Sequence, residues 1–503
     1  MVTTIVDIPN LGKVKGKVFD KTNIRRFHIP YATVPKRWRI AEPVPAWEGE
    51  LDCTQQRPEC PQLNLGLFSR PQRVEPTYDE FNCLNLDITA PPVSDDNDLI
   101  PCMFWIHGGA FSAKSGLFDT YDPERFVEYS IQIGKPVVVV NVTYRLNVCG
   151  FFASSDIKKD VEQAGEAVCG NWGLDDTVKA IHWVKKNIQS FGGDPNRITG
   201  YGESAGSIML HHLLLRPETT FTRAILQSGV VSVIAPVPPS GFDTVWRKLL
   251  DHYQAKTVDD MRKVPANELV KVALENGARH QPLVDSVICE DPIQKYKEQG
   301  AYGSLEALII GDCADEGTIW SHQGDIKELY KSYEDQVPAN LLDRFYQLYP
   351  SDLFDKDPTL AQKMVDELVG EAKFLCPIDR TANAIAKLRP EAQLYRYKVS
   401  RTVEATRSWN MGAHHGIDIF FTFMSDKLTE EERETSERLC SDWLKFAYEE
   451  KLDETSDWNR YDLNKPTMLV YGEQTAMADA TTDRASSICQ FWEEVETASV
   501  QNR

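Results

Sequence analysis

The stretch RITGYGESAGSIMLHHLLL, from Arg197 to Leu215, decides the fold of this chain. It carries the pentapeptide GESAG at 202–206, in which one serine stands between two glycines. The pentapeptide alone is weak evidence, because a chain of this length contains such a pattern by chance on the order of one time in ten. Its context is specific: a β-prone run precedes it and an apolar helical run follows it, which is the context that a nucleophile turn requires.

This turn predicts a nucleophile at Ser204. A sharp strand-to-helix turn holds its serine in strained backbone geometry that only small neighbours permit, and Gly202 and Gly206 supply them. Ser204 then lies at the N-terminus of a helix, where the backbone dipole favours developing negative charge.

Short apolar runs on both sides of the turn predict the rest of the fold. Strands are expected at 99–109, 135–145, 196–201, 306–312, 392–400 and 466–472. The run at 135–145 is apolar and β-branched, which is typical of a strand buried on both faces. A helix is expected at 173–193, ending near Gly192. Strands that alternate with helices indicate an α/β fold with an open, mostly parallel sheet.

Composition bounds the domain organisation and the partners. The chain has 503 residues, of which 42% are hydrophobic, and a formal net charge of −20. We expect one domain over 1–503, with helical insertions at 231–300 and 320–410 above the sheet. The acidic charge argues against nucleic acid and anionic membranes as partners. We find no run of about 18 apolar residues and no secretory signal in the given chain, so we expect no membrane span and a cytoplasmic protein.

The 11 cysteines are spread along the chain and contain no C-x-x-C spacing, so a zinc site is not expected. We expect the protein to need neither a metal nor a cofactor.

A second requirement for acyl transfer is a set of N–H groups that bind the developing oxyanion. The loop WIHGGAF at 105–111 follows a predicted strand and offers the N–H groups of Gly109 and Ala110. The N–H of Ala205, next to the nucleophile, is the third candidate donor.

Motifs along nearly the whole chain resemble the type-B carboxylesterase/lipase family, the group that includes the cholinesterases. They are IPYA at 29–32, FNCLNLDI at 81–88, WIHGGAF at 105–111, TYRLNVCGFF at 143–152, the block at 170–206, LQSG at 226–229, DEG at 315–317 and GAHHGIDIFF at 412–421. The segment 29–47 looks more like filamentous-fungal, intracellular members. The resemblance implies an α/β-hydrolase fold with a Ser–Glu–His triad at the floor of a deep gorge.

The acid and the base follow from chain order and from the resemblance. In this fold the base comes after the acid, and of the adjacent His414 and His415 only one can meet Ser204. The family motif has its base immediately before the glycine, which implies His415. Its DEG pattern implies that the acid is Glu316, which would hold the imidazole in the correct tautomer.

The sequence evidence for other site residues is weaker. By resemblance Glu203 lines the gorge beside the triad, with a solvated loop carboxylate as the alternative, and Ser228 supplies a supporting hydrogen bond. Candidates for pocket lining follow the oxyanion loop, and a role as ordinary core residues is nearly as well supported for each. They are Phe111, Leu117, Phe118 and Tyr121.

Three departures from the family pattern affect the interpretation. The loop between Cys60 and Cys83 contains no tryptophan to bind a quaternary ammonium group, so choline esters are not expected as substrates. These two cysteines match the family's first disulfide, which implies that they pair, with two reduced thiols in the cytosol as the equal alternative. Asn147 replaces a family glycine, and Ala110 replaces the third glycine of the oxyanion loop, which should narrow the acyl side.

The sequence therefore predicts a serine carboxylic-ester hydrolase that acts on a neutral, fairly apolar small-molecule ester through an acyl-enzyme. The same machinery would serve a lactonase, a thioesterase or an acyltransferase. A remote alternative is a non-catalytic binding protein of the same fold, which the presence of all three triad residues disfavours.

Overall fold

The structure is a computed structural model that describes residues 2–63, 74–93, 98–216, 221–284, 298, 301–480 and 483–501. Two compact units make up the chain. The first contains Met1–Ile225, Ile234–Ser304 and Ala447–Glu449, and the second contains Leu226–Val233, Leu305–Phe446 and Glu450–Arg503.

The sheet of the first unit combines an antiparallel and a parallel part. Its strands, in spatial order, are β1 (Val2–Ile8), β2 (Gly12–Val18), β3 (Arg25–Pro30), β7 (Asn85–Ala90), β9 (Val138–Val142), β8 (Ile100–Ile106) and β10 (Gly193–Glu203). The pairs from β1 to β9 are antiparallel, whereas β8 pairs parallel with both β9 and β10. Two short strands, β4 (Ala32–Thr33) and β5 (Glu42–Pro43), pair separately, and β6 (Glu50–Asp52) adds to β2. The last strand of this unit, β11 (Arg223–Gln227), runs into the second unit.

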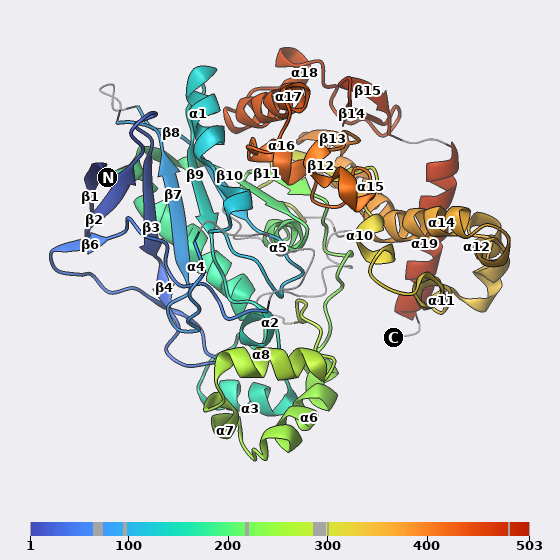
Figure 1. Cartoon of the computed structure of the whole chain (residues 1–503), viewed down its shortest axis with the longest axis horizontal. Coiled ribbons are helices and arrows are strands. Elements are labelled where there is room, and N and C mark those ends of the chain that lie inside the picture. The colour runs from blue at the N-terminus through green and yellow to red at the C-terminus, as the bar shows by residue number, and fades with distance from the viewer. Residues whose placement is uncertain are drawn as a thin grey trace. The chain divides into compact units, whose positions relative to one another are not determined.

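Most helices of the first unit fall into two sets. Against the sheet lie α4 (Trp172–Asn187) and α5 (Ala205–Leu214), both of which pack on β10. Away from it, Figure 1 shows a group formed by α3 (Ser155–Gln163), α6 (Asp243–Tyr253), α7 (Val258–Arg262) and α8 (Ala266–Glu275). The unit also contains α1 (Glu124–Gln132) and α2 (Asn147–Gly150).

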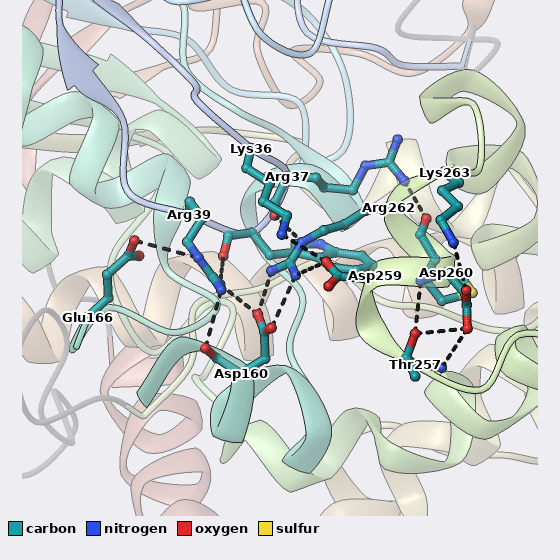
Figure 2. A network of polar contacts seen from close by, with 12 residues as sticks. Lys36, Arg37, Arg39, Asp160, Glu166, Thr257, Asp259, Asp260, Arg262 and Lys263 are labelled. Atoms are coloured by element: carbon teal, nitrogen blue, oxygen red, sulfur yellow. Dashed lines mark hydrogen bonds and ion pairs between the residues drawn. The ribbon is translucent and has the colours of Figure 1, made fainter. Parts of the chain in front are cut away.

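Ion pairs tie this helix group to the N-terminal segment 36–39 (Figure 2). The buried Arg37 bonds Glu80 through Nε at 2.7 Å and donates to the carbonyl oxygen of Met261, at the end of α7, at 2.9 Å. Arg262 of α7 bonds Asp160 of α3 through Nη1 at 3.1 Å. The exposed pairs of this network contribute little each, whereas the buried Arg37 fixes carbonyl groups at the end of a helix.

The second unit contains a parallel sheet and a helical subdomain. Strands β12 (Ala307–Cys313), β13 (Gln393–Val399) and β14 (Thr467–Tyr471) are parallel, and β15 (Ala476–Asp479) is antiparallel to β14. Helix α15 (Cys376–Leu388) packs on β12 and β13. The other long helices are α11 (Ile326–Glu334), α12 (Leu342–Leu348), α14 (Pro358–Gly370), α17 (Glu430–Ala447) and α19 (Asp483–Gln501). Short helices are α10 (Thr318–Ser321), α13 (Leu353–Lys356), α16 (Asp418–Thr422) and α18 (Leu452–Thr455).

The predicted elements agree with this architecture. Each expected strand is present, and the expected helix at 173–193 is α4 followed by a 3-10 turn that ends at Gly192, whose φ is 94°. The segments 231–300 and 320–410 carry helices where the structure describes them. Their role as gorge walls, and the single domain over 1–503, stay predictions.

Candidate active site

The predicted nucleophile lies on a strained turn. Strand β10 ends at Glu203 and helix α5 begins at Ala205, so Ser204 alone forms the connection, with φ 55° and ψ −123°. A non-glycine residue rarely adopts this conformation, and it persists only where the surrounding structure imposes it. The side chain of Ser204 is half-buried and stands at the N-terminal end of α5.

Two glycines allow the close approach that imposes this strain. A Cβ atom on Gly206 would lie 1.9 Å from the carbonyl oxygen of Ile106, at the end of β8. A Cβ atom on Gly202 would lie 2.8 Å from the carbonyl carbon of Gly206. Both contacts are shorter than van der Waals packing permits, so β10, α5 and β8 meet only because these positions lack side chains.

The predicted oxyanion loop lies against the nucleophile turn in the same unit. A Cβ atom on Gly108 would lie 2.4 Å from Glu203 Oε2 and 3.0 Å from Ser204 Cβ. Gly109 has a φ of 104°, and a side chain there would meet the carbonyl oxygen of Ala113 at 2.1 Å. This approach requires glycine at both positions.

Hydrogen bonds fix the carbonyl groups of this loop. The carbonyl oxygen of Gly109 accepts the N–H groups of Ser112 at 2.9 Å and Ala113 at 3.1 Å. The carbonyl oxygen of Phe111 accepts the N–H of Asn147 at 2.7 Å. Within the described ranges, no group accepts a hydrogen bond from the N–H of Gly109, Ala110 or Ala205. Their role as oxyanion donors stays a prediction.

The structure explains why an asparagine stands at position 147, where the family has a glycine. Asn147 has a φ of 48°, in the left-handed region, where asparagine is better tolerated than most side chains. Its amide Nδ2 donates to the carbonyl oxygens of Pro61 at 2.7 Å and Ser112 at 3.3 Å. The asparagine thus adopts a glycine-like backbone conformation and adds bonds that hold the oxyanion loop.

The predicted acid and base contact each other in the second unit. Glu316 Oε2 lies 2.6 Å from His415 Nδ1, and both side chains are buried. Because an ionised carboxylate only accepts hydrogen bonds, Nδ1 must carry the proton and Nε2 is the basic nitrogen. The rings of Trp320 and Phe374 lie at 5.1 and 4.9 Å from the His415 ring.

Two further donors hold the other oxygen of Glu316. Its Oε1 accepts the N–H of Cys313 at 2.7 Å and the hydroxyl of Ser228 at 2.6 Å. Burial alone would raise the pKa of Glu316, but the electrostatic attraction of the His415 ring and the hydrogen bonds from His415, Cys313 and Ser228 outweigh burial and lower the pKa. The carboxylate therefore stays ionised near neutral pH despite its burial. Ser228 donates one of its hydrogen bonds, and a supporting role of Ser228 in the reaction stays a prediction.

The neighbouring acid and histidine shape the loop that carries His415. Asp315 Oδ2 accepts the N–H of Ala413 at 2.7 Å, and a side chain on Gly412 would collide with this carboxylate. His414 Nδ1 lies 2.9 Å from the carbonyl oxygen of His415, so its ring bonds the loop backbone. Of the two histidines, His415 is the one that contacts Glu316.

The other predicted site residues are largely buried. Glu203 is 1% exposed. The pKa of the Tyr144 hydroxyl is raised mainly by the burial of Tyr144, and the charge of Glu203 raises it further. Phe111 packs against Phe151 at 4.7 Å between ring centroids, and Tyr121 packs against Trp105 at 5.3 Å. Leu117 is buried like Phe111 and Tyr121, whereas Phe118 is half-buried. Their burial favours the alternative of core residues, and their role in a substrate pocket stays a prediction.

The cysteines require a correction. Cys60 and Cys83 are free, buried thiols, so the structure lacks the disulfide that the resemblance implies. Part of the loop between them, including Phe68, is outside the described residues. A disulfide joins Cys376 to Cys489 instead, linking α15 to α19. The sequence missed it because the two positions are 113 residues apart and share no local pattern.

Sequence reasoning also missed a contact of the oxyanion loop. His280 Nδ1 lies 2.7 Å from Ser112 Oγ, and His280 is 8% exposed. No local signal reveals this pair, because its members are 168 positions apart.

No group of histidine, cysteine, aspartate or glutamate side chains in the described part of the chain could hold a metal ion. No helix among the described residues is long and apolar enough to cross a membrane.

Known proteins resemble this chain over almost its full length. A family model described as the carboxylesterase family matches residues 2–492. Lipase 3 of Yarrowia lipolytica is 27% identical over 467 residues, covering 88% of this chain and 88% of that protein. Para-nitrobenzyl esterase of Bacillus subtilis is 27% identical over 511 residues, covering 95% of this chain and 97% of its own.

Solved structures give the same result. The structure of a thermophilic PNB esterase superposes with a TM-score of 0.82 at 26% identity, covering 98% of this chain and 100% of the other. A second PNB esterase structure has a TM-score of 0.81 at 25% identity, covering 97% and 99% of the two chains. These likenesses confirm the α/β-hydrolase fold that the sequence predicts.

Proposed function

The chain belongs to the carboxylesterase family and is a carboxylic ester hydrolase of the α/β-hydrolase fold, and from this premise we propose that it acts through a triad of Ser204, His415 and Glu316. In this proposal Ser204 Oγ attacks the ester carbonyl while His415 Nε2 takes its proton. The N–H groups of Gly109, Ala110 and Ala205 hold the oxyanion.

The reaction then proceeds through an acyl-enzyme. His415 returns its proton to the leaving alcohol, and the acyl group stays bonded to Ser204 Oγ. Water, deprotonated by His415, attacks this second ester and releases the carboxylic acid with a regenerated serine. Glu316 stays ionised throughout and stabilises the imidazolium that forms twice in the cycle.

The observation that carries this proposal is the conformation of Ser204. Its φ of 55° places a strained serine at the N-terminus of α5, with the loop of Gly108 against its Cβ. Backbone strain of this kind is concentrated at functional sites. The buried bond between Glu316 and His415 supports the assignment of acid and base.

We propose a neutral, fairly apolar small-molecule ester as the substrate. The net charge of −20 disfavours anionic substrates and nucleic acid. The described part of the loop between Cys60 and Cys83, like its full sequence, contains no tryptophan for a quaternary ammonium group. Ala110, with its added methyl group, favours a short acyl chain.

The cellular location follows from the disulfide. Disulfides persist in oxidising compartments and are rare in the cytosol. The Cys376–Cys489 bond therefore favours an oxidising compartment over the cytoplasmic location that the sequence predicts. Non-reducing peptide mapping of the protein from its native source tests this: a linked peptide pair is expected, and two free thiols would restore the cytoplasmic assignment.

A panel of p-nitrophenyl esters of increasing acyl length tests the mechanism. We expect wild type to hydrolyse short-chain esters fastest and Ser204→Ala to lose at least about 10³-fold in kcat. Equal hydrolysis by both proteins would refute Ser204 as the nucleophile. Product analysis with added alcohols separates hydrolysis from acyl transfer, since an acyltransferase yields mainly the new ester.

A further inference from the structure

A buried histidine contacts the loop that contains the proposed oxyanion donors. His280 Nδ1 lies 2.7 Å from Ser112 Oγ. The same hydroxyl donates to the carbonyl oxygen of Ala110 at 3.0 Å. A chain of two hydrogen bonds therefore runs from an imidazole, through a serine hydroxyl, to the backbone of Ala110.

The proton positions in this chain follow from counting donors. The hydroxyl of Ser112 has one proton, so if it donates to Ala110, it must accept from His280 Nδ1–H. Nε2 is then a bare acceptor, and it has no partner among the described residues. The opposite arrangement would bury an unpartnered Nε2–H and leave Ala110 without its donor, and buried orphan donors are rare. Burial also lowers the pKa of His280 to about 4, which keeps the ring neutral near pH 7.

Hydrogen bonds anchor the segment that follows His280 in the chain. Leu283 exchanges two hydrogen bonds with the side chain of Asn171, at 2.8 and 3.0 Å. The N–H of Val284 donates to the carbonyl oxygen of Val237 at 2.9 Å. Helix α7, which precedes this segment in the chain, is held to α3 and to the segment 36–39 by the ion pairs of Figure 2. His280 is therefore held where a hydrogen bond can constrain another group.

The oxyanion loop requires such a constraint at Ala110. Ala110 and Phe111 have φ values of 53° and 57°, so two consecutive non-glycine residues are in the left-handed region. The carbonyl oxygens of Phe111 and Ser112 are held by Asn147, but that of Ala110 is held by the Ser112 hydroxyl. The hydroxyl, whose direction is set by His280, therefore holds the peptide between Ala110 and Phe111. The preceding peptide, which carries the Ala110 N–H, is held through the carbonyl oxygen of Gly109. The strained backbone of Ala110 lies between these two peptides and keeps its φ and ψ only while both are fixed.

We infer that His280 is a positioning residue for ester hydrolysis: through Ser112 it fixes the peptide between Ala110 and Phe111 and so keeps the strained Ala110 in the backbone conformation in which its N–H can meet the oxyanion. The inference rests on the proposed function, because His280 and Ser112 can affect catalysis in this way only if Ala110 is an oxyanion donor. Neither residue touches the substrate in this account.

The expected effect is on turnover more than on substrate binding. Deleting an oxyanion donor costs about 10²–10³-fold in kcat. Releasing a donor from its correct orientation costs less, so we expect Ser112→Ala and His280→Phe each to lower kcat about tenfold on p-nitrophenyl acetate. KM should change less than threefold, because the ground-state carbonyl gains little from the donor. The double variant should match the worse single variant, since both break one chain of bonds.

A conservative replacement separates positioning from packing. The amide nitrogen of an asparagine reaches the place of Nδ1, so His280→Asn keeps the donor to Ser112 while it leaves a void. We expect His280→Asn to lower Tm yet to retain kcat within threefold of wild type. Tyr302→Phe, which removes a buried hydroxyl 2.8 Å from His211 Nε2, is the matched control and should leave kcat unchanged.

Each outcome decides the inference. Wild-type kcat in Ser112→Ala, or equal loss of kcat in His280→Asn and His280→Phe, would overturn it. If His280→Phe fails to fold, Ser112→Ala and His280→Asn still give the answer. Ser204→Ala in the same assay tests the proposed function separately, because activity that survives there refutes the nucleophile and not the hydrogen-bond chain.

Discussion

Replacing Glu316 by glutamine should strongly lower kcat, because it reverses the tautomer of His415. Glu316 accepts three hydrogen bonds: Oε1 receives the N–H of Cys313 and the hydroxyl of Ser228, and Oε2 receives His415 Nδ1–H. A glutamine has one acceptor oxygen and one NH2 group. The oxygen must stay at the Oε1 place, because the backbone N–H of Cys313 cannot turn away or accept.

The NH2 group of the glutamine then faces His415 Nδ1 and converts it into an acceptor. The proton moves to Nε2, the nitrogen that should receive the proton of Ser204. The corresponding exchange in a Ser-His-Asp hydrolase costs about 10⁴-fold in kcat, or about 5.4 kcal/mol at 1.36 kcal/mol for each factor of ten. We expect the same size of effect here, with little change in KM.

The assay is steady-state hydrolysis of p-nitrophenyl butyrate at pH 8. Glu371→Gln is the matched control, since that carboxylate of the same unit accepts the Tyr349 hydroxyl at 2.8 Å and should behave like wild type. A kcat for Glu316→Gln within tenfold of wild type, in protein that is folded at the assay temperature, would refute the tautomer argument.

Three other changes test the packing and the electrostatics. Gly206→Ala places a methyl carbon 1.9 Å from the backbone oxygen of Ile106. We expect it to lower the free energy of unfolding by about 3 kcal/mol, measured by urea unfolding, and to lower esterase activity. A urea midpoint equal to that of wild type would contradict the close approach. Cys489→Ser opens the bond to Cys376 across 113 residues and should cost about 4–5 kcal/mol, whereas an unchanged Tm would show that the bond adds nothing. The pKa of Glu316 is lowered in the folded protein, so its contribution to stability is full above pH 4.5 and is lost as the pH falls below that value. The difference in unfolding free energy between wild type and Glu316→Gln should therefore shrink between pH 5 and pH 3. A constant difference would contradict the lowered pKa.

The sequence predicts the parts of the fold that have a local signal. The expected strands at 99–109 and 466–472 are β8 and β14, because continuous apolar runs that end in glycine are typical of buried strands. The turn at Ser204 and the bond between Glu316 and His415 follow from short motifs in the right order. The antiparallel strands at the N-terminus, such as β1, are not predicted, since exposed residues interrupt their apolar pattern.

The features that the sequence could not predict depend on contacts between distant residues. The disulfide of Cys376 and the bond between His280 and Ser112 join positions more than a hundred residues apart. Asn147 is visible in the sequence only as a departure from a glycine pattern. Its left-handed backbone and its two amide bonds explain why asparagine is accepted there.

Trapping the acyl-enzyme tests the central claim most directly. A fluorophosphonate or a slowly deacylating p-nitrophenyl ester is added to the protein, and the modified peptide is located by mass spectrometry. We predict one adduct per chain, on the oxygen of Ser204, and none in Ser204→Ala. An adduct on any other residue, or turnover of the ester by an unlabelled Ser204→Ala protein, would contradict the account.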